Sequence, residues 1–271
     1  MNPPYGLDYC HFVMESTYTF IGWERMTIIS SEKASQPTGT LASRGKAAVV
    51  SCFMQLGVMV ILILGVSWIN NHSVSLLYRF TIHSWGRWLF FAIGTLVHEL
   101  SHAVVALLFG FRITEFVPFI ADPSSPILGY VSYLYSPGNP VQQAGHFFVG
   151  IAPIILPLAL LFLLYRFLLP HGLIQEGKVN WRRIFSLSSL LRTMLFLFVT
   201  SNIVMHMRCS PQDLQNAIYG LPPLVIALFF LGVASPKGMR YLLSSSIMLS
   251  LMVIAFSLVN HVLLRGITLI L

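Results

Sequence analysis

Long runs of apolar residues recur along this chain and are separated by short polar or proline-rich segments. A run of about 20 apolar residues is long enough to cross the hydrocarbon core of a bilayer as a helix. Such runs lie at about 47–69, 86–110, 143–169, 185–207, 219–235 and 240–264. The pattern therefore predicts a mainly α-helical fold, a polytopic membrane bundle of about six spans.

The segment 111–142 has a different pattern, because it mixes aromatic and β-branched residues with several prolines. Residues 127–135 are predicted to form a strand, and residues 112–119 are its expected partner. We expect a small β-hairpin or sheet, inserted directly after the second apolar run.

Composition supports the membrane assignment. The chain is 56% hydrophobic and only 9% charged, whereas a soluble domain carries about 25% charged residues. The net charge of +7 would suggest a nucleic-acid partner in a soluble protein. Here the basic residues mostly flank apolar runs, which is typical of anchoring to lipid headgroups. We therefore expect the lipid bilayer as a partner and no nucleic acid.

The orientation follows from the distribution of basic residues. Lys33, Arg44 and Lys46 precede the first run and favour a cytoplasmic N-terminus. The basic residues around the loop after the third run then fall on the outer side, against the rule; they are Arg166, Lys178, Arg182 and Arg183. On balance we expect a multi-pass protein of the cell (inner) membrane with its N-terminus in the cytoplasm.

The second apolar run contains the pentapeptide His98-Glu99-Leu100-Ser101-His102. Residues four apart share one face of a helix, so His98 and His102 can bind one zinc ion together. Glu99 is placed to act as the general base on a zinc-activated water. Ionisable side chains inside a bilayer helix are costly, which makes two histidines in ordinary helix packing a poor explanation.

A catalytic zinc usually takes three protein ligands, so a third is needed. Of the nine acidic residues, four lie in the N-terminal tail and Glu99 is the expected base. The remaining candidates are Glu115, Asp122, Glu176 and Asp213. Asp213 is preferred, because an unpaired carboxylate between two apolar runs is costly.

Asp213 also follows Ser210-Pro211 and could act as a helix cap, and the two roles could coexist. For Asp213 to reach the histidines, the fourth run must lie against the second. His146 could line the site, and His206 could orient a ligand from outside the first coordination shell.

These residues resemble the site-2 proteases, a family of intramembrane zinc metallopeptidases. Residues 94–110 are similar to the family's zinc-binding helix, and 129–133 and 150–153 resemble the strand and the small-residue turn that follow it. The family's third ligand is an Asp in a Leu-Asp-Gly motif with an upstream Asn. Here Asn202 precedes Gln212-Asp213-Leu214, so the Asp is present without its flanking pattern. The resemblance covers about 88–216.

The expected organisation follows from these assignments. Residues 1–46 form a polar tail, and 47–85 form the first span and its loop. Residues 86–216 form the metalloprotease-like core, and 217–271 form the C-terminal spans.

The expected function is hydrolysis of peptide bonds in membrane-protein or peptide substrates. His98, His102 and Asp213 are expected to bind Zn²⁺. Glu99 acts as the base, and Asn202 is a candidate donor to the oxyanion. The strand at 127–135 could hold the substrate extended.

Three alternatives remain. A heat-shock type of membrane zinc metalloprotease would need a downstream Glu ligand and a sizeable soluble domain. A transporter or channel would use the same polar membrane residues to bind an ion. The chain could also be a catalytically inactive scaffold.

Overall fold

The structure is a computed structural model that describes residues 41–78, 83–168, 174–175, 178–179 and 186–270. By its internal contacts the chain divides into two units, Met1–Thr40 and Leu41–Leu271. Most of the predicted polar tail, and the candidate ligand Glu176, lie outside the described residues.

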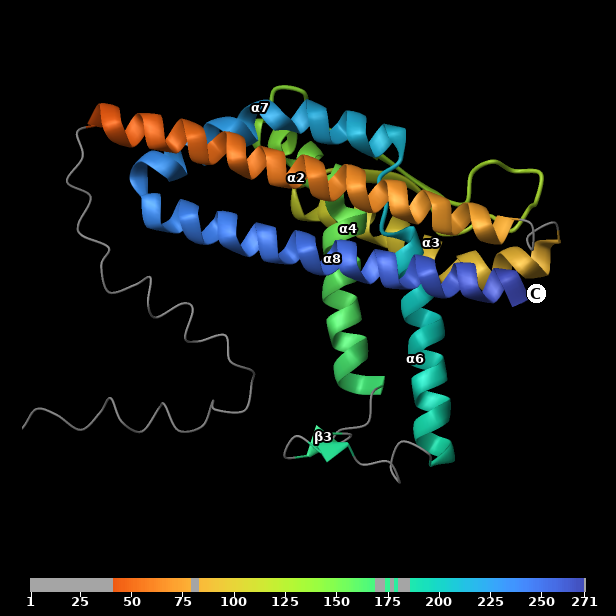
Figure 1. The fold of residues 1–271 in the computed structure, drawn as a ribbon. Helices are drawn as coiled ribbons and strands as arrows, with labels where there is room; N and C mark the ends of the chain where they lie inside the picture. The colour runs from red at the N-terminus through yellow and green to blue at the C-terminus, as the bar shows by residue number, and fades with distance from the viewer. Residues whose placement is uncertain (1–40, 79–82, 169–173, 176–177, 180–185, 271) are drawn as a thin grey trace, which may run out of the picture. The chain divides into compact units, whose positions relative to one another are not determined.

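Six helices of the second unit are long and apolar enough to cross a membrane (Figure 1). They are α2 (Leu41–Tyr78), α3 (Ser84–Leu108), α4 (Pro140–Leu168), α6 (Leu187–His206), α7 (Pro211–Ala234) and α8 (Pro236–Ile270). The predicted fold class, a mainly α-helical membrane bundle of about six spans, is confirmed.

Several helix boundaries differ from the predictions, most of all those of α2 and α7. α2 begins at Leu41 and has 38 residues, so it extends beyond the apolar run at both ends. α7 begins at Pro211, well before the predicted start at residue 219. The reason is local. Ser210 caps the helix and Pro211 occupies the first turn, and the polar residues Gln212, Asp213, Gln215 and Asn216 interrupt the apolar run there.

The predicted β-hairpin is present. β1 (Arg112–Val117) and β2 (Tyr130–Leu134) pair antiparallel, with an irregularity in the register between Ile113 and Glu115. The loop between the strands is tied to the start of α3 by Arg87. Its guanidinium donates to the backbone carbonyls of Asp122, Pro123 and Ser125. Two short strands, β3 (Ile174–Gln175) and β4 (Lys178–Val179), form a second small sheet.

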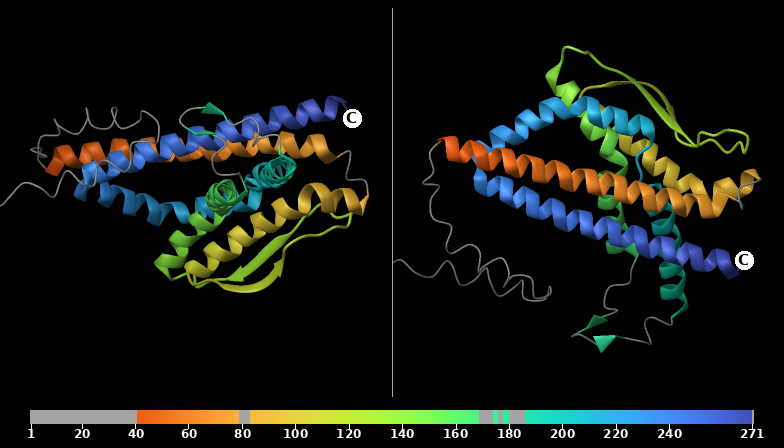
Figure 2. Two further views of the ribbon diagram at one scale, coloured as in Figure 1. Left: turned by 90° about the horizontal axis from the view of Figure 1, so that it is seen from below. Right: turned by 45° about the horizontal axis from the view of Figure 1, so that its top comes forward.

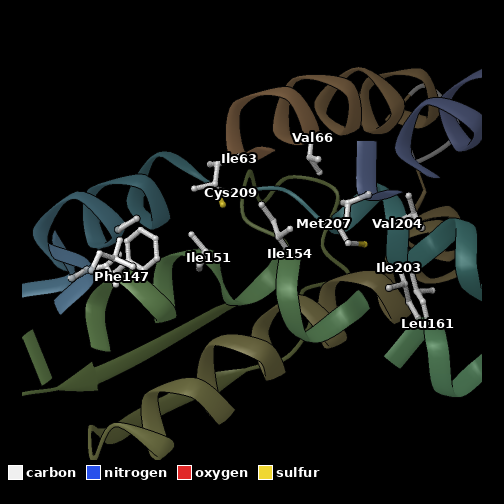
Figure 3. Close-up of a cluster of buried hydrophobic side chains, with 14 of the residues drawn as sticks. Ile63, Val66, Phe147, Ile151, Ile154, Leu161, Ile203, Val204, Met207 and Cys209 are labelled. Carbon is white, nitrogen blue, oxygen red and sulfur yellow. The ribbon is translucent and has the colours of Figure 1, made fainter. Parts of the chain in front are cut away.

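The long helices α2 and α8 lie side by side, and α4 and α6 run steeply across them (Figures 1 and 2). α6 contacts α3, as the position predicted for Asp213 required. The core lies where these helices cross (Figure 3). It includes Val66 of α2, Ile154 of α4, Ile203 of α6, and Met207 and Cys209 of the segment that joins α6 to α7.

The outer faces of the helices are apolar. Phe53, Ile61 and Trp68 of α2, and Phe162 and Phe167 of α4, are among the large apolar side chains that are more than half exposed. Exposed apolar area on this scale is costly in water but matches a hydrocarbon environment. Together with the six apolar helices, it defines a multi-pass membrane protein.

Candidate metal centre

α3 carries His98 and His102 one turn apart, so both side chains leave the same face of the helix. Their rings lie 4.9 Å apart, centre to centre, and their Nε2 atoms are 3.3 Å apart. His102 is only 6% exposed. The prediction that one helical turn brings two imidazole nitrogens together therefore agrees with the structure.

Each ring is oriented by a backbone carbonyl from a different helix. His98 Nδ1 lies 2.9 Å from the carbonyl oxygen of His206, and His102 Nδ1 lies 2.8 Å from that of Val149. A carbonyl oxygen only accepts hydrogen bonds, so each Nδ1 must carry the proton and donate. In the neutral rings, each Nε2 is then an unprotonated nitrogen with its lone pair directed at the centre.

These two carbonyls are free to accept for sequence reasons. His206 is the last residue of α6, so its carbonyl has no helical partner. It accepts from the Arg208 N–H at 2.8 Å and keeps a second lone pair for His98. Val149 lies within α4, four residues before Pro153. Proline has no N–H, so it leaves the carbonyl four residues earlier without its helical partner. His102 donates to the oxygen that Pro153 leaves open.

Asp213 approaches the histidines from the first turn of α7. Its Oδ1 lies 3.2 Å from His102 Nε2, and its Oδ2 lies 3.8 Å from His98 Nε2. The same carboxylate completes a capping box, since Oδ2 accepts from the Ser210 N–H at 2.7 Å and the Asp213 N–H donates to Ser210 Oγ at 3.2 Å. The predicted coexistence of the two roles is geometrically satisfied, with Ser210 rather than Asp213 as the N-cap.

The segment 207–210, which joins α6 to α7, is held by hydrogen bonds from α2. Asn70 Nδ2 donates to the Met207 carbonyl at 2.7 Å, and the Cys209 N–H donates to Ser67 Oγ at 2.9 Å. On the other side, Gly150 of α4 packs against the backbone of Asp213. These contacts determine where the carboxylate of Asp213 lies.

The unprotonated Nε2 atoms of His98 and His102 therefore converge with the Asp213 carboxylate, and none of the three groups donates a hydrogen bond to another. Ligand atoms of His98, His102 and Asp213 all lie within 4.8 Å of one another, and this group could hold a metal ion. Two unprotonated nitrogens and a carboxylate at this spacing repel one another in a buried site unless a cation lies between them. The donor set fits a metal cation.

Glu99 lies beside this group, in the wall of a cavity of about 410 Å³. His98, Gly129 and Arg208 line the same cavity. The backbone at Gly129, just before β2, approaches so closely that a Cβ there would be 3.0 Å from Glu99 Cγ. The hairpin therefore covers the Glu99 side of the cavity, and the candidate metal centre opens into the space beneath it.

Asn202 does not line this cavity in the structure. Its side chain is 2% exposed and ties α6 to α3. Oδ1 accepts from the Gly94 N–H at 3.1 Å, and Nδ2 donates to the Leu89 carbonyl at 3.3 Å. Both ends of the amide are already engaged. The geometry thus favours a positioning role over the predicted role as oxyanion donor.

The other candidates from the sequence lie elsewhere. His206 contributes its carbonyl, and its ring lies where a Cβ on Gly94 would be. His146 is buried among Phe111, Tyr135 and other aromatic rings. Glu115 accepts a hydrogen bond from the Tyr130 hydroxyl on the hairpin.

Asp122 is held at the far end of the hairpin loop. Hydrogen bonds from the backbone and side chain of Ser124 hold the pKa of the Asp122 carboxyl below its usual value. This carboxylate remains exposed, outside the metal centre.

Sequence reasoning missed two residues near the centre. Arg208 lines the cavity, although its place in a short polar break between apolar runs was a visible signal. Tyr133 of β2 is half-buried, and burial with the nearby Asp213 carboxylate raises the pKa of its hydroxyl to about 12. No local pattern distinguishes Tyr133 from the other tyrosines of the hairpin.

Comparison of the sequence with models of known protein families, with curated proteins and with solved structures finds no match. The class of the protein therefore rests on its own fold and site. It is a multi-pass membrane protein whose helices α3 and α7 bring together a group of side chains that could hold a metal ion.

Proposed function

We propose that this protein is an intramembrane zinc metallopeptidase of the site-2 protease type. One observation carries the proposal: His98, His102 and Asp213 converge within helices apolar enough to cross a membrane, and His98 shares the lining of a cavity with Glu99. Two imidazoles and a carboxylate beside a second, non-ligating carboxylate are the parts of a hydrolytic metal site.

The spacing of the ligand atoms supports zinc. Zinc–nitrogen bonds of about 2.0–2.1 Å in a tetrahedral site separate the ligand atoms by about 3.3–3.4 Å. The two Nε2 atoms are 3.3 Å apart, and His102 Nε2 is 3.2 Å from Asp213 Oδ1. The third distance, from His98 Nε2 to Asp213 Oδ2, is 3.8 Å and would shorten on binding. Three protein ligands would leave the fourth position open, as in catalytic rather than structural zinc sites.

Glu99 supplies the proton transfer in this proposal. When bound, zinc would act as a Lewis acid that acidifies water and polarises the substrate carbonyl. The Glu99 carboxylate takes a proton from the attacking water and returns it to the leaving amine, so the peptide C–N bond breaks as the new C–O bond forms. The carbonyls of His206 and Val149 hold the two imidazoles in the tautomer that a metal requires.

The substrate would be a peptide segment of a membrane protein. A helical peptide bond is shielded by its own hydrogen bonds, so the segment must be extended before it is cut. The stretch of chain from Pro126 to Gly129 lines the cavity just before β2. This stretch leads into β2, which pairs with β1 along one edge in a two-stranded sheet. The other edge of β2 can pair with an extended substrate by strand addition.

The test combines metal content with proteolysis. The purified protein should contain about one zinc per chain, measured by mass spectrometry of the metal. Alanine at His98, His102 or Asp213 should remove it, because two ligands hold a catalytic zinc poorly. Glu99→Gln should keep the zinc and abolish cleavage of an unfolded membrane peptide.

Asp122→Asn is the matched control, since it removes an exposed carboxylate of the same region. That variant should keep both zinc and activity. Unchanged metal content in all three alanine variants would overturn the proposal. Stoichiometric zinc without any proteolysis in the wild type would leave only a metal-binding scaffold.

A further inference from the structure

Arg208 has a position that the proposed chemistry does not use. It lies in the segment between α6 and α7, and its side chain lines the cavity that contains His98 and Glu99. Its Nη1 donates to Asn71 Oδ1 of α2 at 2.7 Å. A guanidinium carries five N–H donors in a planar fork. The bond to this neutral amide oxygen uses one of those donors and does not neutralise the charge.

No carboxylate of the described residues forms a direct ion pair with Arg208. Asp213 is near enough to interact with its charge, but its oxygens lie beside the Nε2 atoms of His98 and His102. Glu99 lines the same cavity and is the proposed base. Glu115 is engaged with Tyr130 on the hairpin, and Asp122 with Ser124. A cation without a direct ion pair among membrane helices is costly. An anion that enters the cavity would remove that cost.

We infer that Arg208 binds a carboxylate of the substrate, so that the enzyme selects peptides with an acidic group next to the bond that is cut. The inference rests on the proposed function. Arginine matches a carboxylate with two parallel hydrogen bonds, which gives both strength and direction. The carboxylate has two chemical sources, an Asp or Glu side chain and a free C-terminus.

The size of the cavity places the acidic group close to the reacting bond. The cavity has a volume of about 410 Å³, which admits only a short stretch of chain. Arg208 and His98 line the same cavity. A carboxylate held by Arg208 therefore belongs to the residues directly flanking the scissile bond.

The competing explanation is structural, because the bond to Asn71 could simply brace the segment 207–210 against α2. Two substitutions separate these roles. Asn71→Ala removes the brace and leaves the guanidinium in place, whereas Arg208→Gln removes the charge and keeps a polar side chain. Arg208→Lys keeps the charge but loses the planar fork.

The experiment uses four fluorescent peptides with one apolar sequence. Each carries Asp or Asn at its centre and ends in a carboxylate or an amide. Their dissociation constants are measured by anisotropy on the full-length Glu99→Gln protein in detergent, and their cleavage on the active protein. We expect at least about tenfold tighter binding of a peptide with the recognised carboxylate than of its neutral counterpart. A difference between the Asp and Asn peptides identifies a side-chain carboxylate, and a difference between the carboxylate and amide ends identifies a free C-terminus.

The variants test the residue. Arg208→Gln in the Glu99→Gln background should abolish the preference, Arg208→Lys should keep part of it, and Asn71→Ala should keep it in full. Equal binding of all four peptides to the Glu99→Gln protein overturns the inference, whether or not Arg208→Gln folds. Cleavage by the active protein without any carboxylate preference would overturn the inference and leave the protease proposal intact. Carboxylate-selective binding without any cleavage would overturn the protease proposal and leave the recognition of a carboxylate by Arg208 intact.

Discussion

Single residues affect the candidate metal centre through backbone atoms, which no sequence motif reveals. Pro153 acts on His102 indirectly. Its missing N–H leaves the Val149 carbonyl open, and His102 Nδ1 donates to that carbonyl. Partners of this kind orient a ligand and set its basicity, and their loss typically costs 10–100-fold in metal affinity. Proline at this position is therefore part of the candidate site.

Pro153→Ala should weaken zinc binding by about tenfold or more. The new N–H can form the helical hydrogen bond that proline lacks, so it competes with His102 for the Val149 carbonyl. The affinity is measured by competition with a chelator of known affinity.

Pro157→Ala is the matched control, because it lies one turn later in the same helix and releases the carbonyl of Pro153 instead. Zinc affinity that falls equally in both variants would show that the general shape of α4 matters, and not the carbonyl of Val149.

Between elements, glycines permit the close helix crossings that build the site. A Cβ on Gly94 of α3 would collide with the ring of His206 and the carbonyl of Asn202 in α6. A Cβ on Gly150 of α4 would collide with the carbonyl of Asp213 and would lie 2.7 Å from the Ala217 nitrogen in α7. Backbone cannot move aside as a flexible side chain can. Both crossings therefore require a residue without a side chain.

Gly150→Ala should separate α4 from α7 and move Asp213 away from the histidines. We expect lower zinc affinity and a destabilisation of about 1–3 kcal/mol, the usual cost of overpacking. Thermal unfolding and metal titration of the purified protein measure the two effects.

Gly57→Ala serves as the control, since nothing lies within 4 Å of the position of its Cβ. It should be neutral or stabilise α2 by about 0.5–1 kcal/mol, because alanine favours the helix. If Gly150→Ala behaved like Gly57→Ala, the tight packing of α4 on α7 would not determine the site.

For the whole molecule, the metal centre joins parts of the chain that are far apart in sequence. His98 and His102 belong to α3, Asp213 belongs to α7, and the carbonyls that orient the histidines come from α4 and α6. A metal that binds only the folded arrangement stabilises it by mass action. Metal and fold should therefore be coupled.

Removing the metal with a chelator should lower the melting temperature, and zinc should restore it. At a free zinc concentration 100 times the dissociation constant, the expected stabilisation is about 2.7 kcal/mol. Magnesium should have little effect, because it prefers an octahedral set of oxygen ligands. An Asp213→Ala protein that gained as much stability from zinc as the wild type would contradict the assigned ligand set.

Local patterns in the sequence determined much of this protein. Apolar length predicted the six helices, and alternating aromatic and β-branched residues predicted the β1–β2 hairpin. The helical repeat placed His98 and His102 on one face. Each of these properties depends on residues a few positions apart, so it can be read from the chain directly.

Tertiary structure decided the rest. The approach of the Asp213 carboxylate, the open carbonyl of Val149 and the cavity beside Arg208 all depend on how α3, α4, α6 and α7 cross. The same crossing turned Asn202 towards the backbone of α3. Helix crossing is set by close packing between residues distant in the chain, which local periodicity does not encode.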